Sequence, residues 1–380
     1  MLLREASVGV TSTKDVGRDT AIDVLRGLCL TSMTVGHIAI SLGGGSAVNT
    51  MVHLPLFIDG AQGFVFLSGV SVALADTARR SRRQSTSTRN GWLLGRALFI
   101  YLLHVILTIG AIAVFRVVGF PSFVPERSLD MRLLTDVILF RELVGLMDVL
   151  ALYVVFLVLT PLALLSRARA AQWAVAVTSM AVYLVSQWRP ELSSLHAGED
   201  EKVVWIVGAW QLLYFGGLLC GLNWWRFRAG LRSRVGRRFA LGAGATVLLG
   251  ILTLRATFAL TEVLVAGTPE WRARLEDELL FDKAFLPPEQ LLLVVPFGLS
   301  LYVGLSLLES RFSHLFDPFR RMGARSLRVY LMSCVAVMIT ATSVGQVGQI
   351  GKEVVILLAT AAVLLLGLPR TRGKGRPWSI

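Results

Sequence analysis

The chain has 380 residues, of which 54% are hydrophobic and only 17% are charged. About a quarter of the residues of a soluble domain are charged, so this composition excludes an ordinary soluble protein and indicates a polytopic membrane protein. The formal net charge of +13 does not indicate nucleic acid as a partner, because the basic residues cluster in short segments between the apolar runs. We therefore expect membrane lipids, and no nucleic acid, among the partners.

Ten apolar segments approach the length of about 20 residues that a helix needs to cross the hydrocarbon core. A membrane β-barrel would show short segments of alternating polarity instead, so we predict an all-α polytopic fold. The basic segments alternate with acidic ones such as HAGEDEK (196–202), which places the N-terminus and the C-terminus in the cytoplasm. The ten predicted spans are 22–42, 54–76, 92–115, 143–165, 171–188, 204–224, 239–262, 290–308, 326–344 and 352–368.

No internal repeat or shift in composition separates a soluble domain from the rest. We expect a cytoplasmic segment over 1–21, a single membrane domain over 22–368 and a basic cytoplasmic tail over 369–380. No metal site is predicted, because the three cysteines lie inside predicted spans without the spacing of a zinc site.

The first predicted span contains ionisable residues that a lipid-facing helix would avoid. Arg26 and His37 are 11 positions apart, which is about 1100° of helix rotation and about 16 Å of rise, so they lie on one face. Such groups usually face the bundle interior or a water-filled cavity. Alternatively, Asp23 and Arg26 form a helix cap and a topology anchor, and His37 is a hydrogen-bonded packing residue.

An acyl-CoA would suit this stripe of the helix. Its phosphates would meet Arg26 at the cytoplasmic mouth, and the extended pantetheine arm would bring the thioester to His37. A neutral imidazole is a competent general base for a hydroxyl that attacks a thioester. We expect acyl-CoA as a co-substrate and no permanently bound cofactor.

The stretch RDTAIDVLRGLCLTSMTVGHI (18–38) resembles the opening of the OpgC family, the membrane succinyltransferases of osmoregulated periplasmic glucans. It also fits the Arg-x10-His pattern of the wider acyltransferase-3 superfamily. Further segments that resemble the family are DGAQGFVFLSGVSVAL (59–74), GRALFIYLLHVIL (95–107), MDVLALYVVFLVLTPLALL (147–165), AWQLLYFGGLLCG (209–221), FDKAFLPPEQLL (281–292) and MGARSLRVYLMS (322–333).

The resemblance implies a multi-pass enzyme of the bacterial cytoplasmic (inner) membrane. Such an enzyme uses cytoplasmic succinyl-CoA, or alternatively acetyl-CoA, to acylate an envelope glycan on the outer side. The essential Arg and His of the superfamily's first-span motif fall on Arg26 and His37. The chain departs from the family at Gln62, where an acid is expected, and this bears on acceptor binding.

Candidates for the chemistry on the outer side are catalytic Asp59 and Asp148, which would orient His37, and His53 and Gln62, which would bind the acceptor. The alternative for both aspartates and for His53 is a solvated helix end.

Candidates for donor binding on the cytoplasmic side are Arg96, His104 and Arg325, beside Arg26. The alternatives are a topology anchor for Arg96, a packing role for His104 and contact with anionic lipid headgroups for Arg325. For Gln211 we expect a hydrogen bond that bridges two helices.

The leading prediction is therefore a membrane O-acyltransferase. The alternative is a transporter or flippase for a lipid-linked sugar or an acylated metabolite. Transporters often show related halves or repeated broken helices, and neither is visible in the sequence.

Overall fold

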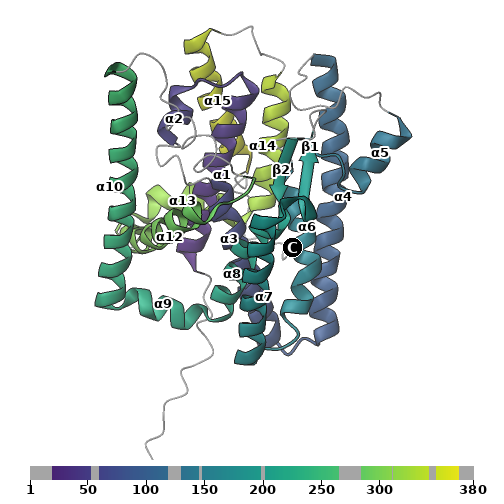
Figure 1. Ribbon diagram of the computed structural model, residues 1–380, viewed down its shortest axis with the longest axis vertical. Coiled ribbons are helices and arrows are strands. Elements are labelled where there is room, and N and C mark those ends of the chain that lie inside the picture. Colours follow the sequence, from purple (N-terminus) through teal and green to yellow (C-terminus); the bar gives the residue numbers. More distant parts are fainter. Residues whose placement is uncertain are drawn as a thin grey trace, which may run out of the picture.

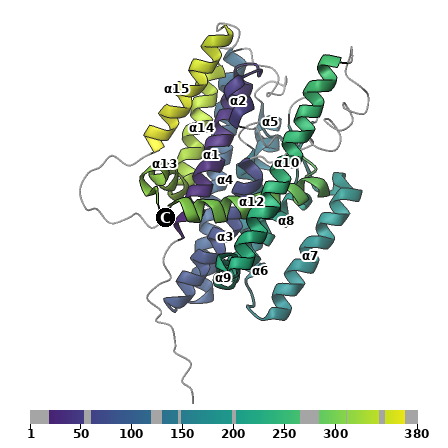
Figure 2. The same cartoon turned by 90° about the vertical axis from the view of Figure 1, so that its left-hand side faces the viewer.

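The computed structural model describes residues 19–52, 60–118, 130–144, 148–197, 202–264, 284–309, 311–341 and 348–367. These form a bundle of helices with one short β-hairpin (Figures 1 and 2). The helices are α1 (Thr20–Ser41), α2 (Ala47–Val52), α3 (Gly60–Ser81), α4 (Thr86–Val118), α5 (Met131–Ile138), α6 (Val149–Ala163), α7 (Arg169–Trp188), the 3₁₀ turn η2 (Pro190–Leu192), α8 (Val207–Leu222), α9 (Trp224–Arg232), α10 (Arg234–Leu264), α12 (Pro288–Glu309), α13 (Ser313–Ala324), α14 (Ser326–Ala341) and α15 (Gln349–Gly367).

Each of the ten predicted spans overlaps at least one helix, so the helical class of the fold is confirmed. The predicted helix over 204–224 is wrong at its start, where β2 (Lys202–Ile206) pairs antiparallel with β1 (Ser194–Ala197). The β-branched and aromatic residues of KVVWI favour a strand, and the helix begins only at Val207.

Among the described residues, five helices are long and apolar enough to cross a membrane, namely α1, α3, α4, α10 and α12. Helices α13 and α14 meet at 86° and would make a sixth crossing if the bent pair forms one span. Helices α6 and α8 are apolar but only 15 and 16 residues long. The helices therefore indicate a membrane protein, while ten crossings with both termini in the cytoplasm remain a prediction.

Helix α1 lies in the middle of the bundle, and α14 runs parallel to it. The guanidinium of Arg26 donates a hydrogen bond to Oγ of Ser326, the first residue of α14. Near the other end of both helices, the hydroxyls of Ser41 and Thr340 are 2.8 Å apart. These two contacts show which positions of α1 and α14 lie side by side along the bundle.

Glycines bring α3 close to its two neighbours. A methyl group on Gly60 would overlap the carbonyl of Cys29 in α1, and one on Gly69 would overlap the carbonyl of Tyr214 in α8. Gly217 of α8 lies equally close to a carbonyl of α3. Small residues allow such close approach of helix backbones inside a membrane, where packing replaces the hydrophobic effect as the force between helices.

Helix α13 crosses α1 in the same manner. A methyl group on Gly27 would overlap the carbonyl of Phe319, and one on Gly323 would overlap the carbonyl of Asp23. This crossing holds the bend between α13 and α14 against α1, the helix that carries Arg26 and His37. The start of α14 is therefore held beside Arg26.

Candidate functional site

Arg26 lies between α3 and the start of α14. Its guanidinium donates to Ser326 Oγ, and its Cζ atom is 5.8 Å from the centroid of the Phe64 ring. Ser326 is only 7% exposed. These contacts direct the cation into the bundle, as we expected for an ionisable group in the first span.

Tyr153 of α6 lies beside Phe64 and was not singled out from the sequence. The two ring centroids are 5.8 Å apart, and Tyr153 is 8% exposed. The positive charges of Arg26 and Arg96 both act electrostatically on the Tyr153 hydroxyl. The only hydrogen bond described for this hydroxyl, within the part of the chain that the structure describes, is a long one of 3.5 Å to the Phe64 carbonyl. We call Arg26, Phe64, Arg96 and Tyr153 the arginine–tyrosine cluster.

A second buried tyrosine next to the cluster is fully satisfied. The hydroxyl of Tyr214 is 2.8 Å from Thr160 Oγ1, and its ring stacks on Phe156 with centroids 5.0 Å apart. The charge of Arg96 acts on Tyr214 as well. The hydroxyl of Tyr214 therefore makes a shorter hydrogen bond than the 3.5 Å bond from Tyr153 to the Phe64 carbonyl.

His37 is half-buried on α1, eleven positions and about 16 Å beyond Arg26. Asp148, which is 5% exposed, acts electrostatically on Tyr330 and Cys334 of α14. These two residues lie four and eight positions beyond Ser326, which is the partner of Arg26. Asp148 therefore lies near the stretch of α14 between Ser326, the partner of Arg26, and Thr340, the partner of Ser41.

Gln62 is buried in the contact between α3 and α12. Its Nε2 donates to Oε1 of Gln290 at 2.6 Å, and both side chains are 1% exposed. The uncharged amide thus occurs where the family resemblance led us to expect an acid, and it connects two helices two positions from Phe64.

The other two candidates for donor binding, His104 and Arg325, lie in different parts of the bundle. His104 is fully buried, with Nδ1 3.4 Å from Thr108 Oγ1 and its ring centroid 5.1 Å from that of Phe140. These contacts lie on the side of α4 that faces the end of α5, and they favour the packing alternative. Arg325 is exposed at the bend between α13 and α14, directly before Ser326.

Two of the predicted site residues, His53 and Asp59, lie outside the described residues. The prediction for Gln211 is confirmed. Its Nε2 donates to the Ser179 carbonyl at 2.7 Å, and its Oε1 accepts from Ser179 Oγ at 2.7 Å, which joins α8 to α7.

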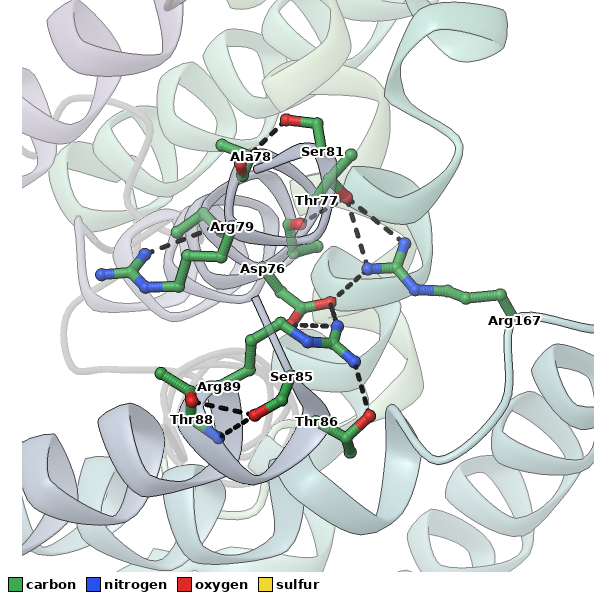
Figure 3. A network of polar contacts seen from close by, with 12 residues as sticks. Asp76, Thr77, Ala78, Arg79, Ser81, Ser85, Thr86, Thr88, Arg89 and Arg167 are labelled. Atoms are coloured by element: carbon green, nitrogen blue, oxygen red, sulfur yellow. Dashed lines mark hydrogen bonds and ion pairs between the residues drawn. The ribbon is translucent and has the colours of Figure 1, made fainter. Parts of the chain in front are cut away.

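A charged cluster at the far end of α3 was also not singled out (Figure 3). The carboxylate of Asp76 accepts hydrogen bonds from Arg89 Nη1 at 2.8 and 3.1 Å and from Arg167 Nη2. Arg167 also donates to Thr77 Oγ1 at 3.3 Å. Asp76 is 2% exposed and Arg89 6% exposed, so one buried carboxylate joins α3, α4 and the connection from α6 to α7.

We expect Asp76→Asn to lower the free energy of unfolding by about 3 to 5 kcal/mol, because it leaves buried guanidinium groups without their counter-charge. Thermal unfolding of the detergent-solubilised protein measures this loss. Glu191→Gln is the matched control, since the Arg189–Glu191 pair is 54% and 56% exposed and such pairs contribute little. Equal melting temperatures for the two variants would contradict the role assigned to Asp76.

The family model described as OpgC protein matches residues 18–373. A search of curated proteins found no match. The family match begins before α1 and extends past α15, so it includes the arginine–tyrosine cluster, His37, Asp148 and the Asp76 cluster. The resemblance seen in the sequence is confirmed: the chain belongs to the OpgC family.

Proposed function

We propose that this protein is an integral-membrane O-acyltransferase that transfers a succinyl group, or alternatively an acetyl group, from cytoplasmic acyl-CoA to a hydroxyl of an envelope glycan on the outer side. Membership of the OpgC family implies an acyltransferase. The observation that supports the choice of donor is the arginine–tyrosine cluster, where a buried and weakly bonded hydroxyl lies within electrostatic reach of Arg26 and Arg96. Such a site attracts an anion with hydrogen-bond acceptors, as acyl-CoA provides.

In the proposed reaction, Arg26 and Arg96 hold the anionic part of the donor, and the thioester extends along α1 toward His37. The imidazole accepts the proton of the glycan hydroxyl while the oxygen of that hydroxyl attacks the thioester carbonyl. The resulting tetrahedral intermediate collapses to the ester and expels the CoA thiolate, which takes the proton from the imidazolium and so restores the neutral His37. Asp148, near the middle of the neighbouring α14, is proposed to support the charged imidazolium.

We further propose ten crossings with both termini in the cytoplasm, in the bacterial inner membrane. This orientation is supported by the arginine-rich α9 and the arginine-rich turn between α3 and α4, which both lie at the lower end of Figure 1. Cysteine labelling from either side of the membrane, at Ser85 in that turn and at Asn49 in α2, tests the orientation.

The purified protein in lipid nanodiscs should transfer label from succinyl-CoA or acetyl-CoA to isolated envelope glucan. Mass spectrometry of the glucan then identifies the acyl group from the mass that each transfer adds. Transport of a lipid-linked sugar across vesicles, without acyl transfer from either donor, would replace this function by the transporter alternative.

Tyr153→Phe should raise the KM for acyl-CoA about fivefold to tenfold, because it removes one hydrogen bond to the donor, which contributes on the order of 1 kcal/mol. The ring and its contact with Phe64 are retained, so the fold should persist. Initial rates over a range of donor concentration measure the effect.

Tyr214→Phe is the matched control for Tyr153→Phe. It removes a hydroxyl that is bonded to Thr160, so it should lower the melting temperature and leave the KM for the donor unchanged. A similar rise in KM for both variants would show that Tyr153 has no particular role in donor binding.

A further inference from the structure

Helix α9 and the first turn of α10 form a basic and aromatic corner near the lower end of the bundle (Figure 1). Six arginines and no acidic residue lie between positions 224 and 238. Large apolar side chains are exposed among them, with Trp225 at 43%, Val235 at 79% and Phe239 at 71%. The α9 surface comprises the exposed Trp225, Arg226, Arg232, Arg234, Val235, Arg238 and Phe239.

The opposite face of α9 is anchored to the start of α1. Oδ2 of Asp19 accepts hydrogen bonds from Trp224 Nε1 at 3.2 Å and from Tyr302 Oη of α12 at 3.0 Å, and it forms an ion pair with Arg228 Nε at 3.3 Å. Oδ1 of the same carboxylate accepts from the backbone N–H of Ala21 and caps α1. Asp19 is 7% exposed, so one buried carboxylate joins three helices.

The angle between α9 and α10 is also fixed. Ser233 Oγ accepts from the backbone N–H of Gly236 at 3.0 Å and caps the start of α10. A methyl group on Gly236 would overlap the carbonyl of Gly230, so the two helix ends touch through their backbones. The arginines of both helices therefore belong to one continuous corner.

We infer that the α9 surface docks on the headgroups of anionic phospholipids and that this contact steadies α1. Short helices with arginines beside exposed tryptophan and phenylalanine lie in the interface of a membrane, where the cations meet lipid phosphates and the aromatic rings enter the acyl boundary. The absence of acids from this segment matches a negatively charged partner.

Arg228 connects the surface to α1. Its Cζ lies 5.7 Å from the centroid of the Trp225 ring, and its Nε lies 3.3 Å from the Asp19 carboxylate. Arg228 thus contacts both Trp225, which we place at the membrane, and Asp19, which caps the helix that carries Arg26 and His37. A change in the position of Trp225 can reach that cap through this one side chain.

The binding test uses the full chain in nanodiscs that contain brominated phosphatidylglycerol or brominated phosphatidylcholine. The fluorescence of the Trp225→Phe variant is subtracted from that of the unmodified protein, and the difference is the signal of Trp225. We expect phosphatidylglycerol to quench this signal at a lower mole fraction than phosphatidylcholine does. Arg226→Gln/Arg232→Gln/Arg234→Gln should lower the apparent affinity for phosphatidylglycerol by roughly tenfold or more.

The matched control for the binding test is Arg80→Gln/Arg82→Gln/Arg83→Gln. It removes the same charge from an exposed turn that has no exposed aromatic side chain, so the preference of Trp225 for phosphatidylglycerol should persist. Equal quenching of Trp225 by the two lipids, or equal loss of preference in both triple variants, would overturn the inference.

A second readout rests on the proposed acyl transfer. The transfer rate of the unmodified protein should rise severalfold as phosphatidylglycerol replaces phosphatidylcholine, and the α9 triple variant should lose this dependence. If phosphatidylglycerol quenches Trp225 selectively but the transfer rate does not depend on the lipid charge, the proposed link from the α9 surface through Asp19 to α1 is refuted. Absence of acyl transfer in every lipid would instead count against the proposed function, while the quenching result would still decide the lipid site.

Discussion

His37→Gln is expected to lower kcat for acyl transfer by about 10²- to 10⁴-fold, the usual contribution of a positioned general base. Glutamine keeps polarity and approximate size but does not accept a proton near neutral pH. The KM for acyl-CoA should change little, because the donor's anionic part is held about 16 Å away at Arg26. Steady-state rates with labelled donor separate these two parameters.

His314→Gln serves as the matched control for the His37 variant. His314 is exposed on α13, so its replacement should leave both kcat and KM unchanged. Equal melting temperatures for the His37 variant and the unmodified protein would show that the loss is chemical. Full transfer activity of His37→Gln would contradict the proposed mechanism.

The positions of the helices were predictable because apolar runs of about 20 residues are a strong signal in a single sequence. The inward direction of Arg26 was predictable for a related reason, since a charged side chain in lipid is expensive. Both features depend on residues that are close in the sequence. The structure adds which helices supply the partners, namely Phe64 from α3 and Ser326 from α14.

Features that depend on distant pairs were not predictable. Arg89 and Arg167 resemble other arginines that follow apolar runs, yet their shared partner Asp76 lies 13 and 91 positions away. Tyr153 is one aromatic residue among many apolar ones in the span 143–165. Its place depends on how α6 packs against α4, which carries Arg96, and on its contact with Phe64 of α3. A single sequence does not encode that register in any local pattern.

The bend between α13 and α14 is a similar case. The segment FRRMGARS suggests only a basic helix end, whereas the structure has an 86° turn there. Gly27 and Gly323 allow α13 to lie closely across α1 next to this turn, because neither has a side chain at the contact. This crossing places Ser326 at Arg26, so a packing feature determines part of the candidate site.

Arg26→Gln should raise the KM for acyl-CoA by about 10- to 100-fold, because a charge-assisted hydrogen bond to an anion contributes about 1.5 to 3 kcal/mol. Arg26→Lys should restore only part of this loss. Lysine keeps the charge but lacks the planar fork with which arginine can reach Ser326 and face the Phe64 ring together. The measurement is the KM for succinyl-CoA or acetyl-CoA at saturating glucan.

Two further variants locate the donor's anionic part. Ser326→Ala removes a partner of Arg26 without removing the charge, so it should raise the KM only a few-fold, by the roughly 1 kcal/mol of one hydrogen bond. Arg325→Gln removes the neighbouring but exposed cation. If the phosphates bind inside the bundle, the effects on KM should decrease from Arg26→Gln through Ser326→Ala to Arg325→Gln. The reverse order would place the phosphates at the exposed bend and leave Arg26 with a structural role only.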